Sequence, residues 1–402
     1  MPEISNRATG LPESPIRKLA PFANAAKESG VKVYHLNIGQ PDIKTPQVFF
    51  DAIAAADTSL LSYSPSAGIL SLREEVAKYY CRYDCDVVAD DVLITTGASE
   101  GINFVLRAIL DAGEEMIVPE PYYANYLSFT MANDGVLVPV PSSIENDFAL
   151  PKISEFEAKI TSKTRAIMIC NPANPTGILY PKAALTELLD LVERRDLFLI
   201  ADEVYREFVY DGHKHHSVLS FGKQYENIIV IDSISKRFSA CGARIGSVIS
   251  KNQKLLQMIL KMAQARLSPP TFGQIGAEAV YRLPDEYYQT NITEYQKRRD
   301  VVLGWLQKIP GVVCPEINGA FYAMARLPVD NSDRFCEWML KEFRHRNSTV
   351  MLAPGSGFYV TPELGSDEVR IAYVLNCDDL TVAMECLEAG LAAYPRRTGA
   401  PK

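Results

Sequence analysis

Several polar residues that could do chemistry follow directly after apolar runs in this 402-residue chain. Lys236 comes just after the β-branched run at residues 228–231, and Arg244 stands eight residues farther on. A lysine at the end of a buried strand can lie in a cleft, where loss of hydration lowers its pKa and leaves a neutral, nucleophilic amine. The guanidinium of arginine matches the oxygens of phosphate. Because most single lysines are solvated surface residues, the interpretation depends on what the other strand ends supply.

The other strand ends carry a set of small, aromatic and polar residues. In chain order these are Gly97, Ala98, Ser99, Tyr123, Asn174, Asp202, Tyr205, Ser233 and Ser235. They follow short apolar runs at residues 92–95, 115–118, 165–170, 197–201 and 228–231, which alternate with helical patterns. Such alternation predicts an α/β fold with a mostly parallel sheet covered on both faces. Ligands bind at the carboxyl ends of the strands in such sheets, so these residues are expected to share one site.

Several helices and a second domain can be placed from the pattern. Ser71 and Glu74 form a capping-box pattern at the start of a helix through residue 83, and a helix is expected over residues 100–110. Past residue 283 the pattern changes to a helix at 285–307, a strand-like run at 312–327, a helix at 333–343, a strand at 368–375 and a helix at 380–393. We expect an N-terminal arm with a first small-domain strand (1–45), a large domain (46–288) and a small domain (289–402).

Composition limits the class of protein. The net charge of −8 argues against a nucleic-acid partner. No apolar run approaches the length of a membrane span, and no signal peptide is evident. The eight cysteines form no CxxC pair, which favours free thiols and a cytoplasmic location.

Taken together and in this order, the strand-end residues resemble those of the class I and II aminotransferases, which are pyridoxal-phosphate enzymes of fold type I. The resemblance extends from Gly39 to Arg370. It implies a large domain with a mostly parallel seven-stranded sheet flanked by helices, and a smaller α+β domain. It also implies a ping-pong transfer of an amino group from an L-amino acid to a 2-oxo acid, with 2-oxoglutarate as the usual acceptor.

The resemblance implies a role for each residue around the cofactor ring. Lys236 would form the Schiff base with the cofactor aldehyde and then move the proton at the substrate Cα, tasks that need a neutral amine. Asp202 would pair with the pyridine nitrogen and keep it protonated, which makes the ring an electron sink. Tyr205 and Asn174 would hydrogen-bond the phenolic oxygen, and Tyr123 would stack on the ring.

The resemblance also implies a phosphate site and a shared active site. The residues expected at the phosphate are Gly97, Ala98 and Ser99 in the turn after a strand, with Ser233, Ser235 and Arg244. Tyr63 matches a tyrosine that reaches the phosphate of the neighbouring subunit, so the resemblance predicts a homodimer with shared active sites.

The substrate residues are only partly specified. Arg370 matches the arginine that binds the substrate α-carboxylate through two hydrogen bonds. Gly39 matches a backbone position beside that carboxylate. In one aspartate aminotransferase subgroup, a lysine that binds the distal carboxylate of the substrate stands where this chain has Ser99. Other aspartate enzymes bind this carboxylate with an arginine of the partner subunit that lies shortly before a Pro-Pro pair. Arg266 also precedes such a pair, but at a shorter spacing. The string around Arg266 resembles one in alanine aminotransferases as well. Aspartate, alanine and aromatic amino acids all stay open as donors.

Other interpretations of the chain stay open or can be set aside. A β-lyase acting on cysteine conjugates, or a decarboxylase, would use the same cofactor chemistry with a different pocket. A non-catalytic sensor on this fold usually carries a DNA-binding domain, and no such segment fits in residues 1–30. A dinucleotide-binding dehydrogenase is excluded by the lack of GxGxxG after the first strand. Residues 211–216 (DGHKHH) are interpreted as a solvated loop and not as a metal site. Cys241 is interpreted as a packing residue.

Overall fold

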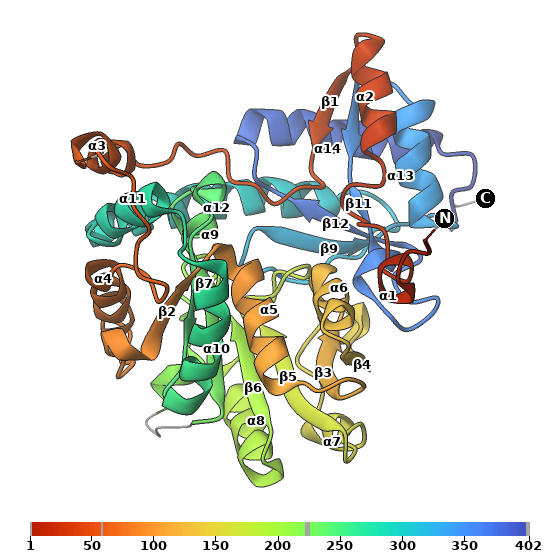
Figure 1. The fold of residues 1–402 in the computed structure, drawn as a ribbon. Helices are drawn as coiled ribbons and strands as arrows, with labels where there is room; N and C mark the ends of the chain where they lie inside the picture. The colour runs from red at the N-terminus through yellow and green to blue at the C-terminus, as the bar shows by residue number, and fades with distance from the viewer. Residues whose placement is uncertain (1, 58, 222–225, 399–402) are drawn as a thin grey trace.

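The computed structural model describes residues 2–57, 59–221 and 226–398. A large sheet with helices on both faces forms the lower part of the molecule in Figure 1. A smaller group of strands and helices, built from the N-terminal and C-terminal parts of the chain, lies above it. No helix within the described ranges is long and apolar enough to cross a membrane.

The large sheet has seven strands. Across the sheet their order is β2 (Val92–Thr95), β8 (Gly246–Ile249), β7 (Ile228–Ser233), β6 (Phe198–Asp202), β5 (Thr164–Cys170), β3 (Glu115–Glu120) and β4 (Val136–Pro141). Only β8 runs antiparallel to its two neighbours. The other strands therefore bring their carboxyl ends to one edge, which confirms the predicted mostly parallel seven-stranded sheet.

Two hydrophobic cores cover the two faces of this sheet. In β7, Ile229 and Ile231 face one core while Ile228 and Val230 face the other, as the alternation of side chains along a strand requires. The first core is completed by α5 (Gly97–Ile109), α6 (Asn125–Ala132) and α10 (Gln253–Arg266). The second is completed by α4 (Leu70–Cys81), α8 (Lys182–Arg195) and α11 (Thr271–Tyr281).

The smaller group joins the two ends of the chain. β1 (Lys32–His35) pairs in parallel with β10 (Ser348–Met351), and β11 (Ala353–Pro354), β12 (Glu368–Ala372) and β9 (Tyr322–Arg326) form an antiparallel sheet. Its helices are α2 (Ala20–Glu28), α13 (Ser332–Lys341) and α14 (Cys377–Ala393), while the long α12 (Asp285–Leu306) packs on α14. The short remaining helices are α1 (Asn6–Thr9), α3 (Gln47–Ala55), α7 (Ile153–Glu157) and α9 (Ile234–Arg237). The predicted border at residue 288 falls inside α12, and the three-part division stays a prediction.

Three local predictions are wrong. Ser71 does not cap α4, because its hydroxyl donates to Glu278 on α11 at 2.6 Å and Ile69 holds the N-cap position. Helix α5 begins at Gly97, three residues before the expected start. Only the end of the run at 312–327 is a strand, since β9 begins at Tyr322.

A buried ion pair lies directly behind the strand end that carries Lys236. Arg237 donates to both oxygens of Asp232 at 2.6 and 2.7 Å, and neither side chain is exposed. Tyr80 also donates to Asp232, at 3.1 Å. Asp232 therefore joins the end of β7 to Arg237 on α9 and to Tyr80 on α4.

Replacing Arg237 with methionine is expected to destabilise the protein by about 3–5 kcal/mol, because it leaves the Asp232 carboxylate buried and unpaired. Urea unfolding measures the change in free energy. The matched control is Arg334→Met, since Arg334 pairs with Asp330 on the surface, and this change should cost about 0.5 kcal/mol or less. Equal stabilities of the two variants would contradict a structural role for the buried pair.

Candidate active site

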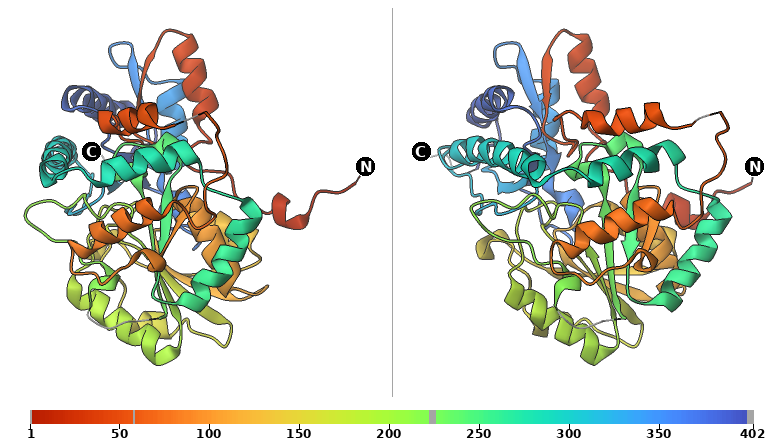
Figure 2. Two further views of the ribbon diagram at one scale, coloured as in Figure 1. Left: turned by 60° about the vertical axis from the view of Figure 1, so that its left-hand side comes forward. Right: turned by 90° about the vertical axis from the view of Figure 1, so that its left-hand side faces the viewer.

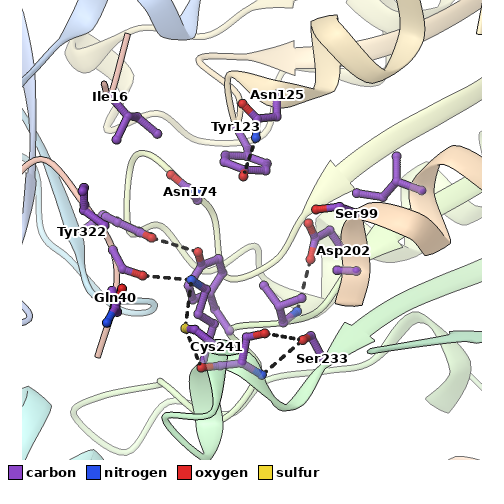
Figure 3. A pocket seen from close by; sticks show the side chains of 18 of the residues that line it. Ile16, Gln40, Ser99, Tyr123, Asn125, Asn174, Asp202, Ser233, Cys241 and Tyr322 are labelled. Carbon is purple, nitrogen blue, oxygen red and sulfur yellow. Dashed lines mark hydrogen bonds between the residues drawn. The ribbon is translucent and has the colours of Figure 1, made fainter. Parts of the chain in front are cut away.

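A cavity of about 650 Å³ opens at the carboxyl ends of β6 and β7. Figure 3 shows Asp202 and Ser233 at the strand ends, Ser99 on α5, and Gln40 and Tyr322 on the opposite side. The cavity brings together most of the residues predicted from the sequence. These are Gly39, Ala98, Ser99, Tyr123, Asn174, Asp202, Tyr205, Ser233, Ser235, Lys236, Arg244 and Arg370.

Lys236 lies in the single turn of helix α9, which begins right after β7. Its Nζ donates to the carbonyl of Gly39 at 2.8 Å. Burial lowers the pKa of Lys236, and the charges of Arg370 and Arg244 act in the same direction. A larger share of the amine is therefore neutral than in a solvated lysine, as a nucleophile or general base requires.

Asp202 ends β6 and is 4% exposed. Its carboxylate accepts from the Tyr126 hydroxyl at 2.6 Å and from the Val204 N–H at 3.2 Å. Burial raises the pKa of Asp202 to about 6, while these two hydrogen bonds act in the opposite direction. No cation in the described part of the chain bonds to this buried carboxylate, which can therefore receive a protonated ring nitrogen.

The turn between β2 and α5 forms a cradle for an anion. Gly97 has a φ of +74°, and a Cβ at this position would lie 2.4 Å from Nη2 of Arg244, so only glycine lets the guanidinium come so close. Because α5 begins at Gly97, the N–H groups of Ala98 and Ser99 belong to its first turn and have no partner within the helix. Together with the positive end of the helix dipole, these groups favour a phosphate.

The serines of the next strand end complete the cradle. The Ser233 hydroxyl donates to Ser235 Oγ at 2.8 Å and accepts from the Ser235 N–H at 3.1 Å. Both serines line the cavity beside Arg244. The predicted phosphate residues therefore surround one corner of the site.

Arg370 lies on β12 and is 1% exposed. Its Nη1 donates to Asn174 Oδ1 at 2.9 Å and its Nη2 donates to the Asn37 carbonyl, while its Nε is buried without a partner among the described residues. Because Arg370 occupies Oδ1 of Asn174, the amide nitrogen of Asn174 stays available as a donor. The orphan donor of Arg370 suits a carboxylate ligand.

Aromatic side chains line the wall next to Arg370. The hydroxyls of Tyr205 and Tyr322 lie 2.9 Å apart, and the Arg370 guanidinium lies 4.5 Å from the centroid of the Tyr322 ring. Gly39 faces the same ring so closely that a Cβ would lie 1.8 Å from the Tyr322 hydroxyl. Tyr123 forms part of the facing wall, where Asn125 donates to its hydroxyl at 2.8 Å (Figure 3).

Three predicted site residues do not line this cavity. Gly97 lies in the turn directly before Ala98, with its backbone next to the Arg244 guanidinium. Tyr63 is 77% exposed. Arg266 pairs with Glu100 at 3.2 Å and also donates to the Ile94 carbonyl. Neither side chain lines the cavity of its own chain.

Several lining residues were not predicted. Arg17 and Ile16 come from the N-terminal arm, Tyr322 from β9, and Asn125 from α6. Cys241, predicted to be a packing residue, also lines the cavity, and its Sγ lies 4.0 Å from Lys236 Nζ. The sequence carries a signal for Tyr322, which lies in the aromatic pair Phe321-Tyr322 two residues after Gly319.

The residues of the cavity fit pyridoxal phosphate. A buried carboxylate without a cation, an anion cradle that a Cβ at Gly97 would fill, and a lysine with a lowered pKa all face one space. These groups match the pyridine nitrogen, the phosphate and the aldehyde of that cofactor. Within the described ranges, no group of three or more His, Cys, Asp or Glu residues could hold a metal ion.

Comparisons with known proteins identify the family of this chain. The family model "Aminotransferase class I and II", a family that uses pyridoxal phosphate, matches residues 31–387. The chain is 32% identical to an aspartate aminotransferase of Pyrococcus horikoshii, covering 96% of this chain and 97% of that protein. It is 33% identical, with the same coverage, to aromatic-amino-acid aminotransferase 2 of Thermococcus litoralis.

Solved structures agree at the level of the fold. A double mutant of the aspartate aminotransferase of Thermus thermophilus superposes with a TM-score of 0.89 at 27% identity, covering 97% of this chain and 100% of that one. An alanine aminotransferase from Pyrococcus furiosus also superposes with a TM-score of 0.89, at 30% identity, covering 96% of this chain and 99% of that one. With the family model matched over most of its length and relatives above 30% identity along nearly all of it, this chain belongs to the class I and II aminotransferases and is an aminotransferase.

Proposed function

We propose that this chain binds pyridoxal phosphate in the cavity and transfers an amino group from an L-amino acid to a 2-oxo acid, with 2-oxoglutarate as acceptor, by a ping-pong route. The observation that carries the proposal is the Lys236 amine, whose pKa is lowered by burial, in the same cavity as the Asp202 carboxylate and the Arg370 guanidinium. When bound, the cofactor would supply an electron sink for the electron pair left at the substrate Cα.

Each side chain around the cofactor ring then has a proposed role. Lys236 Nζ would hold the cofactor through its aldehyde, and the neutral amine would take the proton from the substrate Cα. The Asp202 carboxylate would hold the proton on the ring nitrogen. The amide of Asn174 and the hydroxyl of Tyr205 would donate to the phenolic oxygen, and Tyr123 would stack on the ring.

The phosphate and the substrate carboxylate take opposite ends of the cavity. The Gly97 turn, the two serines and Arg244 would hold the phosphate. The buried Arg370 guanidinium holds the substrate α-carboxylate beside the Gly39 backbone, with its unpartnered Nε as an additional donor. Aspartate, alanine and aromatic amino acids are the proposed donors, because relatives of all three specificities are about equally similar to this chain.

A homodimer would bring Tyr63 to the phosphate of the partner subunit. Large apolar side chains are exposed on α3, on the loop after it, and near the start of α4 and of α11. They are Phe50, Leu60, Leu61, Tyr63, Leu70, Leu267 and Phe272. Since α3 and α4 both pack against α11, these residues belong to neighbouring elements (Figure 2), and an exposed apolar surface of this kind suits a second copy of the chain. Sedimentation should give the mass of a dimer, and a monomer would contradict the shared site.

Half-reactions test the proposed function. Adding an amino donor to the holoprotein should bleach the long-wavelength absorbance of the bound cofactor, and adding a 2-oxo acid should restore it. The absence of any half-reaction with the common L-amino acids would contradict the proposal. Release of pyruvate and ammonia from cystathionine would instead favour the β-lyase alternative.

Removing the Tyr126 hydroxyl should impair the site through Asp202. Its hydrogen bond favours the ionised carboxylate, so Tyr126→Phe raises the pKa of Asp202 and weakens its hold on a protonated ring nitrogen. We expect the acidic limb of the kcat/KM profile to move to higher pH, with a loss of roughly 10-fold at pH 6 and a smaller loss at pH 8. Tyr122→Phe is the matched control, because Tyr122 packs on Tyr126 and has no hydrogen bond to Asp202. An equal loss at both pH values would contradict this positioning role for Tyr126.

A further inference from the structure

The cavity holds one more cation than the proposed function uses. Among the described residues that line it are four basic side chains, Arg17, Lys236, Arg244 and Arg370, and one acidic side chain, Asp202. The proposed function assigns Lys236 to the cofactor, Arg244 to its phosphate and Arg370 to the substrate α-carboxylate. Arg17 has no assigned task.

The arm that carries Arg17 is held firmly on the small sheet. The residues on each side of Arg17 are fixed, since Asn37 Nδ2 donates to the Ile16 carbonyl at 2.7 Å and Lys18 pairs with Asp333. One step farther back, Pro15 packs against the backbone of Gly357, where any Cβ would collide with it. These contacts place the arm at the cavity, where Figure 3 shows Ile16 on the side of Asn174 and Tyr123.

The same contacts connect Arg17 to the α-carboxylate site. Asn37 binds the arm through its side chain, and its carbonyl accepts from Nη2 of Arg370. Ile16, the residue before Arg17, is therefore bonded to Asn37, and the same Asn37 is bonded to Arg370. A substrate held by Arg370 therefore lies close to the segment that carries a second guanidinium.

The Arg17 guanidinium has no hydrogen bond or ion pair with any residue that the structure describes. The nearby arm cations differ in this respect, because Arg7 pairs with Asp134 at 2.8 Å and Lys18 with Asp333. The positive charge of Arg17 is felt inside the site. Burial raises the pKa of Tyr123, and the charges of Arg370 and Arg17 act in the opposite direction. An unpaired guanidinium at the cavity entrance suits a carboxylate.

Arg266 is the alternative that the sequence suggests, and its surroundings differ. It already bonds to Glu100 and to the Ile94 carbonyl, so its charge is balanced within its own chain. Recognition of a substrate by Arg266 would require the loss of that ion pair. Arg17 needs no such rearrangement.

Building on the proposed function, we propose that Arg17 binds the distal carboxylate of dicarboxylic substrates, so that the enzyme accepts dicarboxylic amino acids and 2-oxo acids in preference to monocarboxylic ones. The two arginines then hold the two ends of the substrate, Arg370 the α-carboxylate and Arg17 the side-chain carboxylate. Arg17 is a specificity-determining residue and takes no part in the proton transfer at Lys236.

The test compares dicarboxylic with monocarboxylic ligands on the holoenzyme. In Arg17→Met, kcat/KM for aspartate and for 2-oxoglutarate should fall about 10-fold or more, and the ratio of aspartate to alanine activity should fall by the same factor. The Kd of succinate, a dicarboxylate that cannot react, should rise similarly in calorimetry while that of butyrate stays within about twofold. Arg17→Lys, which keeps the charge without the fork of donors, should recover part of the loss. Arg7→Met is the control, because Arg7 lies on the same arm but outside the cavity, and it should leave both ratios unchanged.

Three results would overturn the inference. These are an equal loss with aspartate and alanine, an unchanged affinity for succinate, and a selective loss of dicarboxylic activity in Arg266→Met in place of Arg17→Met. Each can be told apart from failure of the proposed function, because transamination by the unmodified holoenzyme tests that function directly and succinate binding does not depend on turnover.

Discussion

Replacing Lys236 with alanine is expected to lower the rate of transamination by roughly 10⁴-fold or more. The change removes the amine that we propose bonds to the cofactor and moves the proton at the substrate Cα, and general acid–base catalysis alone contributes about 10²–10⁴-fold. No other lysine lines the cavity, so none of the described residues can take over the task. Single-turnover half-reactions measure the effect on the chemical step.

Two further variants make this prediction specific to the amine. Lys236→Arg keeps a positive charge but supplies no neutral amine, so it should be as inactive as the alanine variant. Lys214→Ala, on an exposed loop, should retain full activity. If Lys236→Ala kept a tenth of the wild-type rate, Lys236 would not be the catalytic base.

Replacing Asp202 with asparagine is expected to lower kcat by roughly 10²–10³-fold, the usual effect of removing one preorganised electrostatic contact. Asparagine has nearly the same shape and can still accept from Tyr126, but it cannot stabilise a proton on the ring nitrogen. The electron-withdrawing power of the bound cofactor should therefore fall while the cavity stays intact. Half-reaction rates with one amino donor measure the loss.

The stability of the same variant separates chemistry from folding. Because burial raises the pKa of Asp202 to about 6, the folded apoprotein holds a proton there between about pH 4 and 6 that the unfolded chain has lost. Its contribution to the free energy of unfolding therefore decreases as pH rises through that range. Asp202→Asn should remove this dependence, so the apoprotein should be at least as stable at pH 7 as the wild type. A strongly destabilised variant would mean that the loss of activity reflects misfolding.

The large sheet and its strand-end residues could be predicted because they depend on local sequence. A strand buried on both faces, such as β7, is apolar along most of its length and ends where polar residues begin. Parallel strands bring their carboxyl ends to one edge, so the residues after β2, β5, β6 and β7 had to meet. The resemblance to a known family then supplied the role that we propose for each residue.

The remaining features depend on contacts between distant parts of the chain. Arg17 is at the cavity because Asn37 and Gly357 hold its arm, contacts that no local pattern of residues 14–18 reveals. The Ser71 capping box was wrong for a similar reason, because a carboxylate on α11 competes for the hydroxyl. Arg266 looked available in the sequence, yet Glu100 on a neighbouring helix pairs with it.

The most direct test of the central claim is to locate the covalent attachment of the cofactor. The holoprotein is treated with borohydride, digested, and analysed by peptide mass spectrometry. The expected result is one pyridoxyl phosphate group on the Nζ of Lys236, with none in the Lys236→Ala variant. A cofactor group fixed to any other lysine, or a holoprotein with none fixed, would contradict the account.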